Sequence, residues 1–175
     1  MKLLLYCTKA KQLLAKVWKH QYELMSFKEI VEQDALNGKI VAECDFEVEE
    51  IKYQDIENYN YDEILPLDKI LEKSCLTKID LEDYLNGNNG YAIHIKNLHI
   101  FDEPRPTKWY GYTDKKGYLR FVEKAPQNMM HCYDAFDNDY VLISIQPQWL
   151  CKILNGDKTI EVRKKVLKRM LDNEK

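Results

Sequence analysis

Apolar and acidic residues alternate along residues 39–51, KIVAECDFEVEEI, and this alternation constrains the fold more than any other stretch of the sequence. Successive side chains of a strand point to opposite faces, so a period of two predicts a strand with one buried and one exposed face. The buried face would carry Ile40, Ala42, Cys44, Phe46 and Val48, and the exposed face would carry Val41, Glu43, Asp45, Glu47 and Glu49. We interpret the acidic side chains as a solvated face rather than a magnesium site, and we expect no metal and no cofactor.

Further elements follow from patterns of the same kind. Strands are expected at residues 2–8, 90–104 and 140–147, a hairpin arm at 115–126, helices at 66–75 and 77–87, and helical or irregular structure through LLAKVW at 13–18. Thr77 followed by Asp80 indicates a helix cap, whereas the acidic, tyrosine-rich residues 53–65 are expected to form a surface loop. In the strand expected at 90–104, apolar residues stand at odd positions as far as Ile95 and at even positions from Leu98 onward. This change of face near Lys96–Asn97 predicts a bulge or a bend, as at the corner of a small barrel. Short strands separated by short helices favour an α+β fold over a doubly wound sheet.

The last part of the chain combines a helix, a strand and a second helix. Residues 147–156, PQWLCKILNG, begin with proline and end with Asn-Gly, which is typical of a helix and its stop. Residues 158–163, KTIEVR, predict a strand, and residues 164–172 predict a basic amphipathic helix. The inward residues of the strand would be Ile160 and Val162, and the outward residues would be Thr159, Glu161 and Arg163. Lys158 follows the helix stop directly, so we expect its side chain to project from a tight turn.

The length of 175 residues suits one domain with an ordinary hydrophobic core, and we expect a single domain over residues 1–175. The apolar run at the start is too short for a signal peptide, and no run approaches ~18 residues, so we expect no membrane span and a cytoplasmic location. The five cysteines are widely spaced and form no Cys-x-x-Cys pair, which favours reduced thiols over a zinc site.

Charge is distributed unevenly along the chain. Residues 1–20 carry +5 and residues 152–175 carry +4, so residues 21–151 carry −12 to give the net charge of −3. The termini of a single domain often lie close together, so the two basic ends would form one cationic face. Such a face predicts an anionic partner. No glycine-rich phosphate loop follows a predicted strand, which argues against nucleotide-triphosphate chemistry of the P-loop kind.

Residues 144–165, SIQPQWLCKILNGDKTIEVRKK, resemble the signature of the ASCH domain, a relative of the PUA fold with the motif G-x-K-x-x-E-x-R. In this sequence the motif residues are Gly156, Lys158, Glu161 and Arg163. The segments GKIVAECDFEVEEI, NGYAIHIKNLHIFDEP and KAPQNMM are also similar to segments of bacterial and phage members. Because four separate segments carry it, the resemblance is more specific than a single motif.

The order of these segments differs from that of most family members. In those, the motif block comes first and a strand similar to LLLYCTK follows, whereas here the block at residues 140–165 comes last. A circular permutation that joins the old termini through HCYDAFDNDY accounts for this order, and a fragment of a tandem array with a truncated second copy is the alternative. Because each segment occurs once, we favour permutation, which is tolerated where termini are close and exposed.

The resemblance implies a small, partly open β-barrel with short helices packed outside and a cleft lined by the motif. Family members are associated with RNA, so it also implies that the partner is RNA or a modified nucleoside or nucleotide. The residues expected to bind this ligand are Lys158, Thr159, Glu161, Arg163, Lys9, Lys164, Trp109 and Tyr110. Lys158 would hold a phosphate, Arg163 would contact a phosphate or a carbonyl, and Glu161 would orient Lys158 or accept a base N–H. Trp109 and Tyr110, in the polar loop KWYGY, would stack on bases.

Two other functions stay open. One bacterial branch of the family is an amidohydrolase acting on N4-acetylcytidine, which combines the motif lysine with a threonine three residues on and a glutamate from the helical segment. Lys158 matches that lysine, but Glu161 stands in the place of the threonine. Ser74 stands in the place of the glutamate, with Glu72 nearby. A small hydrolase acting on an acylated cytidine or on RNA, with Lys158 and Glu161 as the catalytic pair, is therefore one alternative. The other is a phage or host regulator that binds a protein partner through its acidic body.

Overall fold

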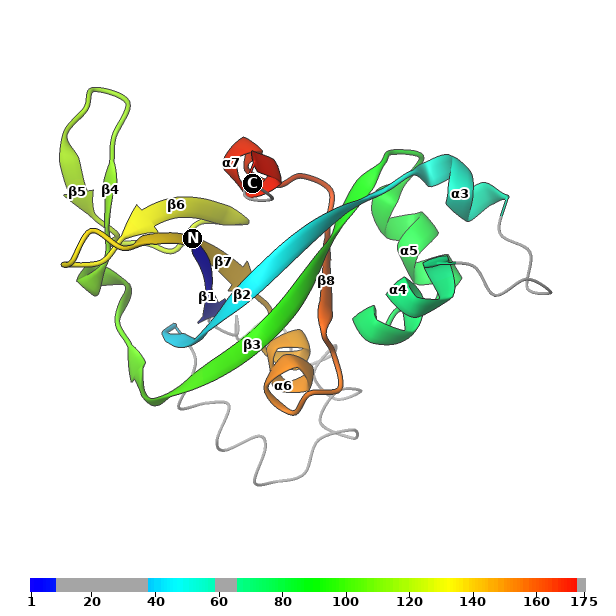
Figure 1. Cartoon of the computed structure of the whole chain (residues 1–175), viewed down its shortest axis with the longest axis horizontal. Coiled ribbons are helices and arrows are strands. Elements are labelled where there is room, and N and C mark those ends of the chain that lie inside the picture. Colours follow the sequence, from blue (N-terminus) through cyan, green and yellow to red (C-terminus); the bar gives the residue numbers. More distant parts are fainter. Residues whose placement is uncertain (9–37, 59–65, 173–175) are drawn as a thin grey trace, which may run out of the picture. The chain divides into compact units, whose positions relative to one another are not determined.

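The computed structural model describes residues 1–8, 38–58 and 66–172 of the chain, and these residues form a mixed α+β fold (Figure 1). The strands are β1 (Lys2–Cys7), β2 (Ile40–Ile51), β3 (Gly90–Arg105), β4 (Gly111–Thr113), β5 (Leu119–Phe121), β6 (Met129–Tyr133), β7 (Asp139–Ile145) and β8 (Ile160–Arg163). The helices are α3 (Tyr53–Glu57), α4 (Pro66–Ser74), α5 (Lys78–Leu85), α6 (Pro147–Leu154), α7 (Lys168–Leu171) and the 3-10 helix η2 (Thr107–Trp109). The predicted α+β class is therefore confirmed. Among the described residues, no helix is both long enough and apolar enough to cross a membrane.

The strands form one sheet in the order β5-β4-β6-β7-β1-β2-β3-β8. The order starts at β5 and ends at β8, so the part of the sheet that the structure describes is not closed into a barrel. β1 pairs in parallel with β7 and antiparallel with β2. The first strand of the chain therefore lies beside the strand that leads into the motif block.

The chain divides into two compact units, each made of two segments. The first unit consists of Met1–Asp45 and Leu98–Leu154, and the second consists of Phe46–Asn97 and Asn155–Lys175. The long strands β2 and β3 run through both units. Asn97, the last residue of β3 in the second unit, has a φ of +49°. The interruption predicted near Lys96–Asn97 corresponds to this left-handed residue, a conformation that asparagine adopts at lower cost than most residues.

The core of the first unit is built around β1 and β7. Its buried residues include Leu4, Tyr6, Ile40, Phe101, Tyr110, Val122, Cys132, Tyr140 and Leu142. The residues of β7 from Tyr140 to Ile145 are all buried, and β1 and β6 pair with this strand on its two sides. Pro147 then begins α6, which lies against β1. The strand and the helix correspond to those predicted for residues 140–156.

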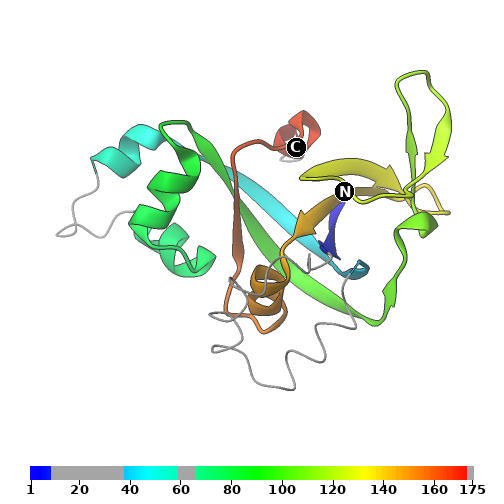
Figure 2. The same cartoon turned by 180° about the vertical axis from the view of Figure 1, so that it is seen from behind.

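The core of the second unit is formed by α3, α4 and α5 with β8 and the adjoining parts of β2 and β3. Its buried residues are Ile51, Ile56, Leu67, Ile70, Leu81, Leu85, Ala92, Ile160 and Val162. Figures 1 and 2 show the three helices gathered at the ends of β2 and β3 that belong to this unit. Thr77 and Asp80 form a reciprocal capping box at the start of α5, as predicted. The left-handed Asn86 ends that helix.

Several predicted elements differ from the structure. Residues 53–57 form α3 rather than a loop, because Ile56 is buried in the core of the second unit. The C-terminal helix predicted at 164–172 is only Lys168–Leu171, because Leu167 has an extended backbone and marks the start of the helix. The strand β6 was not predicted. The segment LLAKVW lies outside the described residues.

The predicted faces of the two long strands are also partly corrected. Along β2, Ala42, Cys44 and Phe46 are buried as predicted, but Val41 of the opposite face is buried too, because β1 and β3 flank the strand at this end. In β3, Ile100 is 47% exposed, and Phe101 is buried in its place. Phe101 packs in the core of the first unit, and the Arg105 guanidinium lies 3.6 Å from the centre of its ring.

Candidate functional site

The motif begins in the turn between α6 and β8. Gly156 has a φ of +82°, and nothing lies within 4 Å of the place where a Cβ would sit. The left-handed conformation, rather than a shortage of space, therefore accounts for the glycine. This turn follows the helix stop predicted from Asn155-Gly156 and leads the chain to Lys158.

Lys158 follows this turn, as expected, and its side chain is buried, with 3% exposed. Its Nζ donates a 2.8 Å hydrogen bond to the backbone carbonyl of Ser74, the last residue of α4. The backbone N–H of Thr159 donates a 2.9 Å hydrogen bond to the carbonyl of Lys73, and its own carbonyl accepts one from Ile95. The last carbonyls of a helix have no partner inside the helix and carry its partial negative charge. Lys158 and Thr159 therefore complete the C-terminus of α4.

Glu161 joins Lys158 and Arg163 into one group, which we call the ion cluster. Glu161 Oε2 lies 3.3 Å from Lys158 Nζ, and Glu161 Oε1 lies 2.9 Å from Arg163 Nη2. The side chains of Glu161 and Arg163 are 11% and 13% exposed. Burial lowers the pKa of Lys158, and the carboxylate of Glu161 opposes that shift. With all three groups ionised, two cations share one carboxylate, so the ion cluster has a net positive charge.

The strand β8 sets the direction of these side chains. Ile160 and Val162 lie in the core of the second unit, which confirms the predicted inward face. Glu161 and Arg163 alternate with them and therefore lie on the other face of the strand. β8 pairs antiparallel with β3, and Arg163 stands opposite Tyr91. The alternation read from the sequence thus brings the two outward charges of the motif together.

Tyr84 and Cys75 were not identified as site residues from the sequence, whereas Lys164 was among the expected ligand residues. Lys164 is exposed, and its Nζ lies 5.2 Å from the centre of the Tyr84 ring on α5. Cys75 has a φ of +58° just after α4, and its thiol donates a 3.4 Å hydrogen bond to the carbonyl of Asp157. No sequence signal marks Cys75, because the left-handed position after a helix is usually occupied by glycine or asparagine.

The other predicted ligand residues lie elsewhere in the chain. Lys9 lies outside the described residues. Trp109 and Tyr110 belong to the first unit. Trp109 is 59% exposed, as expected for a loop that meets bases, whereas Tyr110 is only 2% exposed. Tyr110 is therefore a core residue rather than a stacking surface.

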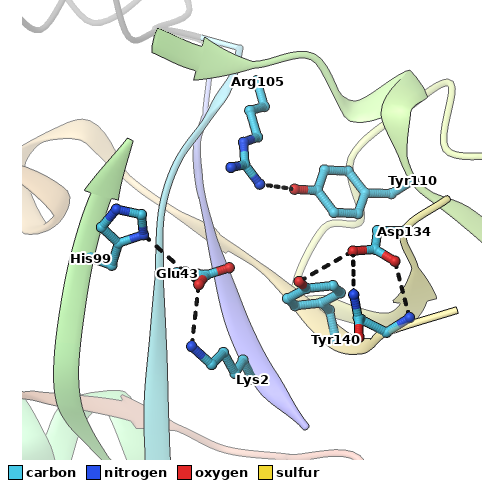
Figure 3. Close-up of polar contacts among 8 residues, drawn as sticks. Lys2, Glu43, His99, Arg105, Tyr110, Asp134 and Tyr140 are labelled. Atoms are coloured by element: carbon cyan, nitrogen blue, oxygen red, sulfur yellow. Dashed lines mark hydrogen bonds and ion pairs between the residues drawn. The ribbon is translucent and has the colours of Figure 1, made fainter. Parts of the chain in front are cut away.

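A polar network of the first unit holds Tyr110 in place (Figure 3). Arg105 Nη1 donates a 3.2 Å hydrogen bond to the Tyr110 hydroxyl, and the Tyr140 hydroxyl donates a 3.4 Å bond to Asp134. The two tyrosine rings meet edge to face, with centres 5.8 Å apart. Burial raises the pKa of Tyr140 to about 12, and the negative charges of Glu43 and Asp134 act in the same direction. Its hydroxyl therefore stays protonated at neutral pH.

Basic side chains pair with the acidic face of β2. The pairs are Glu43 with Lys2 and His99, Glu47 with Lys96, and Glu49 with His94. Within the described part of the chain, no group of three or more His, Cys, Asp or Glu side chains is arranged to hold a metal ion. The pairs lie across strands and are partly exposed, so each contributes little to stability.

No protein-family model, no curated protein and no solved structure matches the chain. The functional interpretation of the ion cluster therefore depends on its residues and their geometry.

Proposed function

We propose that the chain is a circularly permuted, PUA-like protein of the ASCH type that binds RNA or a modified nucleotide through the ion cluster. The observation that carries this proposal is the Glu161 carboxylate, which contacts both cations of the motif, Lys158 and Arg163. A cluster with a net positive charge attracts an anion, and phosphate is the anion that every nucleotide carries. The cytoplasmic location expected from the sequence belongs to the same proposal.

The three charged residues have different roles in this proposal. Lys158 is a positioning residue, because its buried ammonium contacts Ser74 and Glu161 and fixes the carboxylate. Arg163 is the ligand contact, because its side chain is the most exposed of the three. Arginine presents its donors in a planar fork that matches the geometry of phosphate. Glu161 fixes the direction of that fork through its 2.9 Å contact with Nη2.

Lys164, the residue after Arg163, and Tyr84 form another exposed contact of the second unit. The exposed ammonium of Lys164 lies 5.2 Å from the Tyr84 ring, which is 40% exposed. Phosphate contacts and stacking on aromatic rings are the two main interactions by which proteins bind single-stranded RNA. The second unit therefore supplies both kinds of group.

The proposal is tested by fluorescence-anisotropy titration of a labelled single-stranded RNA at two salt concentrations. Arg163→Gln should weaken binding and reduce the slope of log affinity against log salt by about 0.7, the value for one phosphate contact on a single strand. Lys152→Gln is the matched control, because it removes one exposed positive charge from α6 and leaves the ion cluster intact. Equal effects of the two substitutions would show that only net charge matters and would contradict the proposal. Absence of RNA affinity in the natural chain would also contradict it, and a copurifying protein would then favour the regulator.

A second candidate is a hydrolase acting on an acylated cytidine, and the lowered pKa of Lys158 favours it. A buried lysine that loses its proton more readily can activate water beside a carboxylate such as Glu161. Ser74 stands in the place of the glutamate of the amidohydrolase branch but does not replace its carboxylate. The Ser74 hydroxyl instead donates a hydrogen bond to the carbonyl of Leu71. Release of acetate from N4-acetylcytidine, lost in Lys158→Met and kept in Lys152→Met, would support the hydrolase. No turnover by the natural chain would remove it.

A further inference from the structure

Exposed apolar side chains gather on the β4–β5 hairpin of the first unit and on η2 beside it. Trp109, Tyr118, Leu119 and Phe121 are 59%, 61%, 71% and 70% exposed. In Figures 1 and 2 the hairpin extends away from β6 and β7. Large apolar side chains that are exposed together commonly mark an interaction site. We call this area the hairpin surface.

The strand register places Leu119 and Phe121 on the same face of the hairpin. Phe121 stands opposite Gly111, and Leu119 stands opposite Thr113. Gly111 has no side chain to cover the Phe121 ring, and a Cβ there would lie 3.2 Å from Leu119 Cδ1. β5 is the first strand in the sheet order, and η2 lies against it, which brings Trp109 to the same hairpin. Phe121 and Trp109 therefore offer aromatic rings at an outer strand of the sheet.

The turn of the hairpin is fixed by Asp114. Its carboxylate accepts 2.9 Å hydrogen bonds from the backbone N–H groups of Lys116 and Tyr118 and pairs with Arg120 at 3.0 Å. The Arg120 guanidinium also lies 5.7 Å from the centre of the Tyr118 ring. A hairpin held in this way is preorganised, so a ligand that binds it loses less free energy to ordering.

The hairpin surface is cationic in an otherwise acidic part of the chain. Residues 108–124 contain five cations and two acids, so they carry +3, whereas residues 21–151 carry −12. The four lysines of this stretch are all exposed, and they are Lys108, Lys115, Lys116 and Lys124. Lysines near exposed aromatic rings suit a single-stranded nucleic acid, whose phosphates meet the cations and whose bases stack on the rings. Two copies of the hairpin would repel each other, which disfavours self-association through this surface.

From these observations we propose that the hairpin surface binds single-stranded RNA, with Trp109 and Phe121 stacking on successive bases. The inference rests on the proposed RNA-binding function, but it concerns residues outside the motif. Bases in a duplex are stacked on each other and cannot reach a protein ring, so the partner is a single strand. Phe136 provides a contrast, because it is 84% exposed in a turn that carries Asp134 and Asp137. Those negative charges repel phosphate and make Phe136 a matched control.

The experiment compares binding of a labelled oligouridine and of an RNA duplex of equal length to four proteins. These are the natural chain, Trp109→Ala, Phe121→Ala and Phe136→Ala. Stacking is worth roughly 1–3 kcal/mol per base, so Trp109→Ala and Phe121→Ala should each weaken oligouridine binding by about 5- to 150-fold. Phe136→Ala should leave it unchanged, and the duplex should bind more weakly than the single strand. Because the substituted side chains are exposed, urea midpoints should match that of the natural chain, which excludes unfolding as the cause.

The outcomes separate this inference from the proposed function. RNA binding that survives Trp109→Ala and Phe121→Ala but falls in Arg163→Gln overturns the hairpin surface and keeps the ion cluster. Binding that falls in the hairpin variants but not in Arg163→Gln supports the hairpin and contradicts the ion cluster as the contact. No RNA binding by the natural chain overturns both. A concentration-dependent dimer that Phe121→Ala dissociates assigns the surface to a second copy of the chain and overturns RNA docking.

Discussion

Lys158 Nζ lies 2.8 Å from the carbonyl oxygen of Ser74, although the two residues are 84 positions apart in the sequence. This hydrogen bond ties the turn before β8 to the C-terminus of α4. The same ammonium contacts Glu161, which in turn holds Arg163. One buried lysine therefore stabilises a helix terminus and orients the cation that we propose as the ligand contact.

Lys158→Met should lower the free energy of unfolding by about 3 kcal/mol. The substitution removes the ammonium that pairs with the buried carboxylate of Glu161 and donates to the carbonyl of Ser74. The effect should lie at the low end for buried pairs, since Glu161 keeps its contact with Arg163. Urea denaturation measures the difference. Lys152→Met, which removes an exposed lysine from α6, should change stability by no more than about 0.5 kcal/mol. Equal stability of the two variants would show that Lys158 does not hold the helix terminus.

Thr77→Ala should destabilise the chain by about 1 kcal/mol through loss of the helix cap. The hydrogen bonds from Thr77 hold the pKa of Asp80 below its usual value of 3.8. Because the folded pKa is lowered, the stabilisation is fully present above pH 3.8 and is lost as the pH falls through the folded pKa. The difference in urea midpoint between the natural chain and Thr77→Ala should therefore be smaller at pH 3 than at pH 6. A difference that is the same at both pH values would contradict the role of the Asp80 carboxylate.

Native thiols should fall into two classes in reaction with a disulfide reagent at pH 8. Cys7, Cys44 and Cys132 are buried, and burial raises the pKa of each to about 12, so these thiols should not react. Cys75 and Cys151 are partly exposed and should react first. Unfolded chain should yield all five thiols. Rapid labelling of Cys132 in the folded protein, located by mass spectrometry, would be incompatible with its burial.

The same three thiols predict how stability depends on alkaline pH. Their folded pKa of about 12 lies above the value of 9.0 for an unperturbed thiol. Between pH 9 and 12 the unfolded chain releases protons that the folded chain keeps, so the free energy of unfolding should fall as the pH rises. Cys132→Ala removes one of these protons and should make the decline shallower. An unchanged slope would mean that Cys132 ionises alike in both states.

Glu43→Gln should lower the pKa of Tyr140, because the negative charge of Glu43 disfavours tyrosinate. Burial stays the larger cause, so the pKa should remain above the usual value of 10.0. A pH titration of the tyrosine Cζ resonance by NMR follows this group directly. Glu123→Gln removes an exposed carboxylate of the same unit and provides the control. A Tyr140 pKa that does not move in Glu43→Gln would exclude coupling between the two residues.

The parts of the fold that local pattern determines were predictable from the sequence. The alternation in β2 and β8, the capping box of Thr77 and Asp80, and the stop at Asn155-Gly156 each depend on residues a few positions apart. The motif likewise identified three side chains that do meet in space.

What the sequence did not reveal depends on partners that are distant along the chain. The turn at Lys158 was predicted but its burial was not, because nothing near it in sequence indicates the carbonyl of Ser74. Tyr110 was expected to be exposed because Tyr140 and Arg105, which hold it in the core, are not part of its local pattern. Phe121 was not identified at all, because the pattern of its own strand does not show that this face stays uncovered.

The most direct test of the ion cluster as a ligand site is NMR observation of Arg163 during RNA addition. The chain has four arginines, so the Nε–H resonance of Arg163 can be assigned by its loss in Arg163→Lys. The account predicts that oligouridine shifts this resonance in a saturable manner and that added salt reverses the shift. An Arg163 resonance that stays in place while the protein binds RNA would contradict the proposal that the motif contacts the ligand.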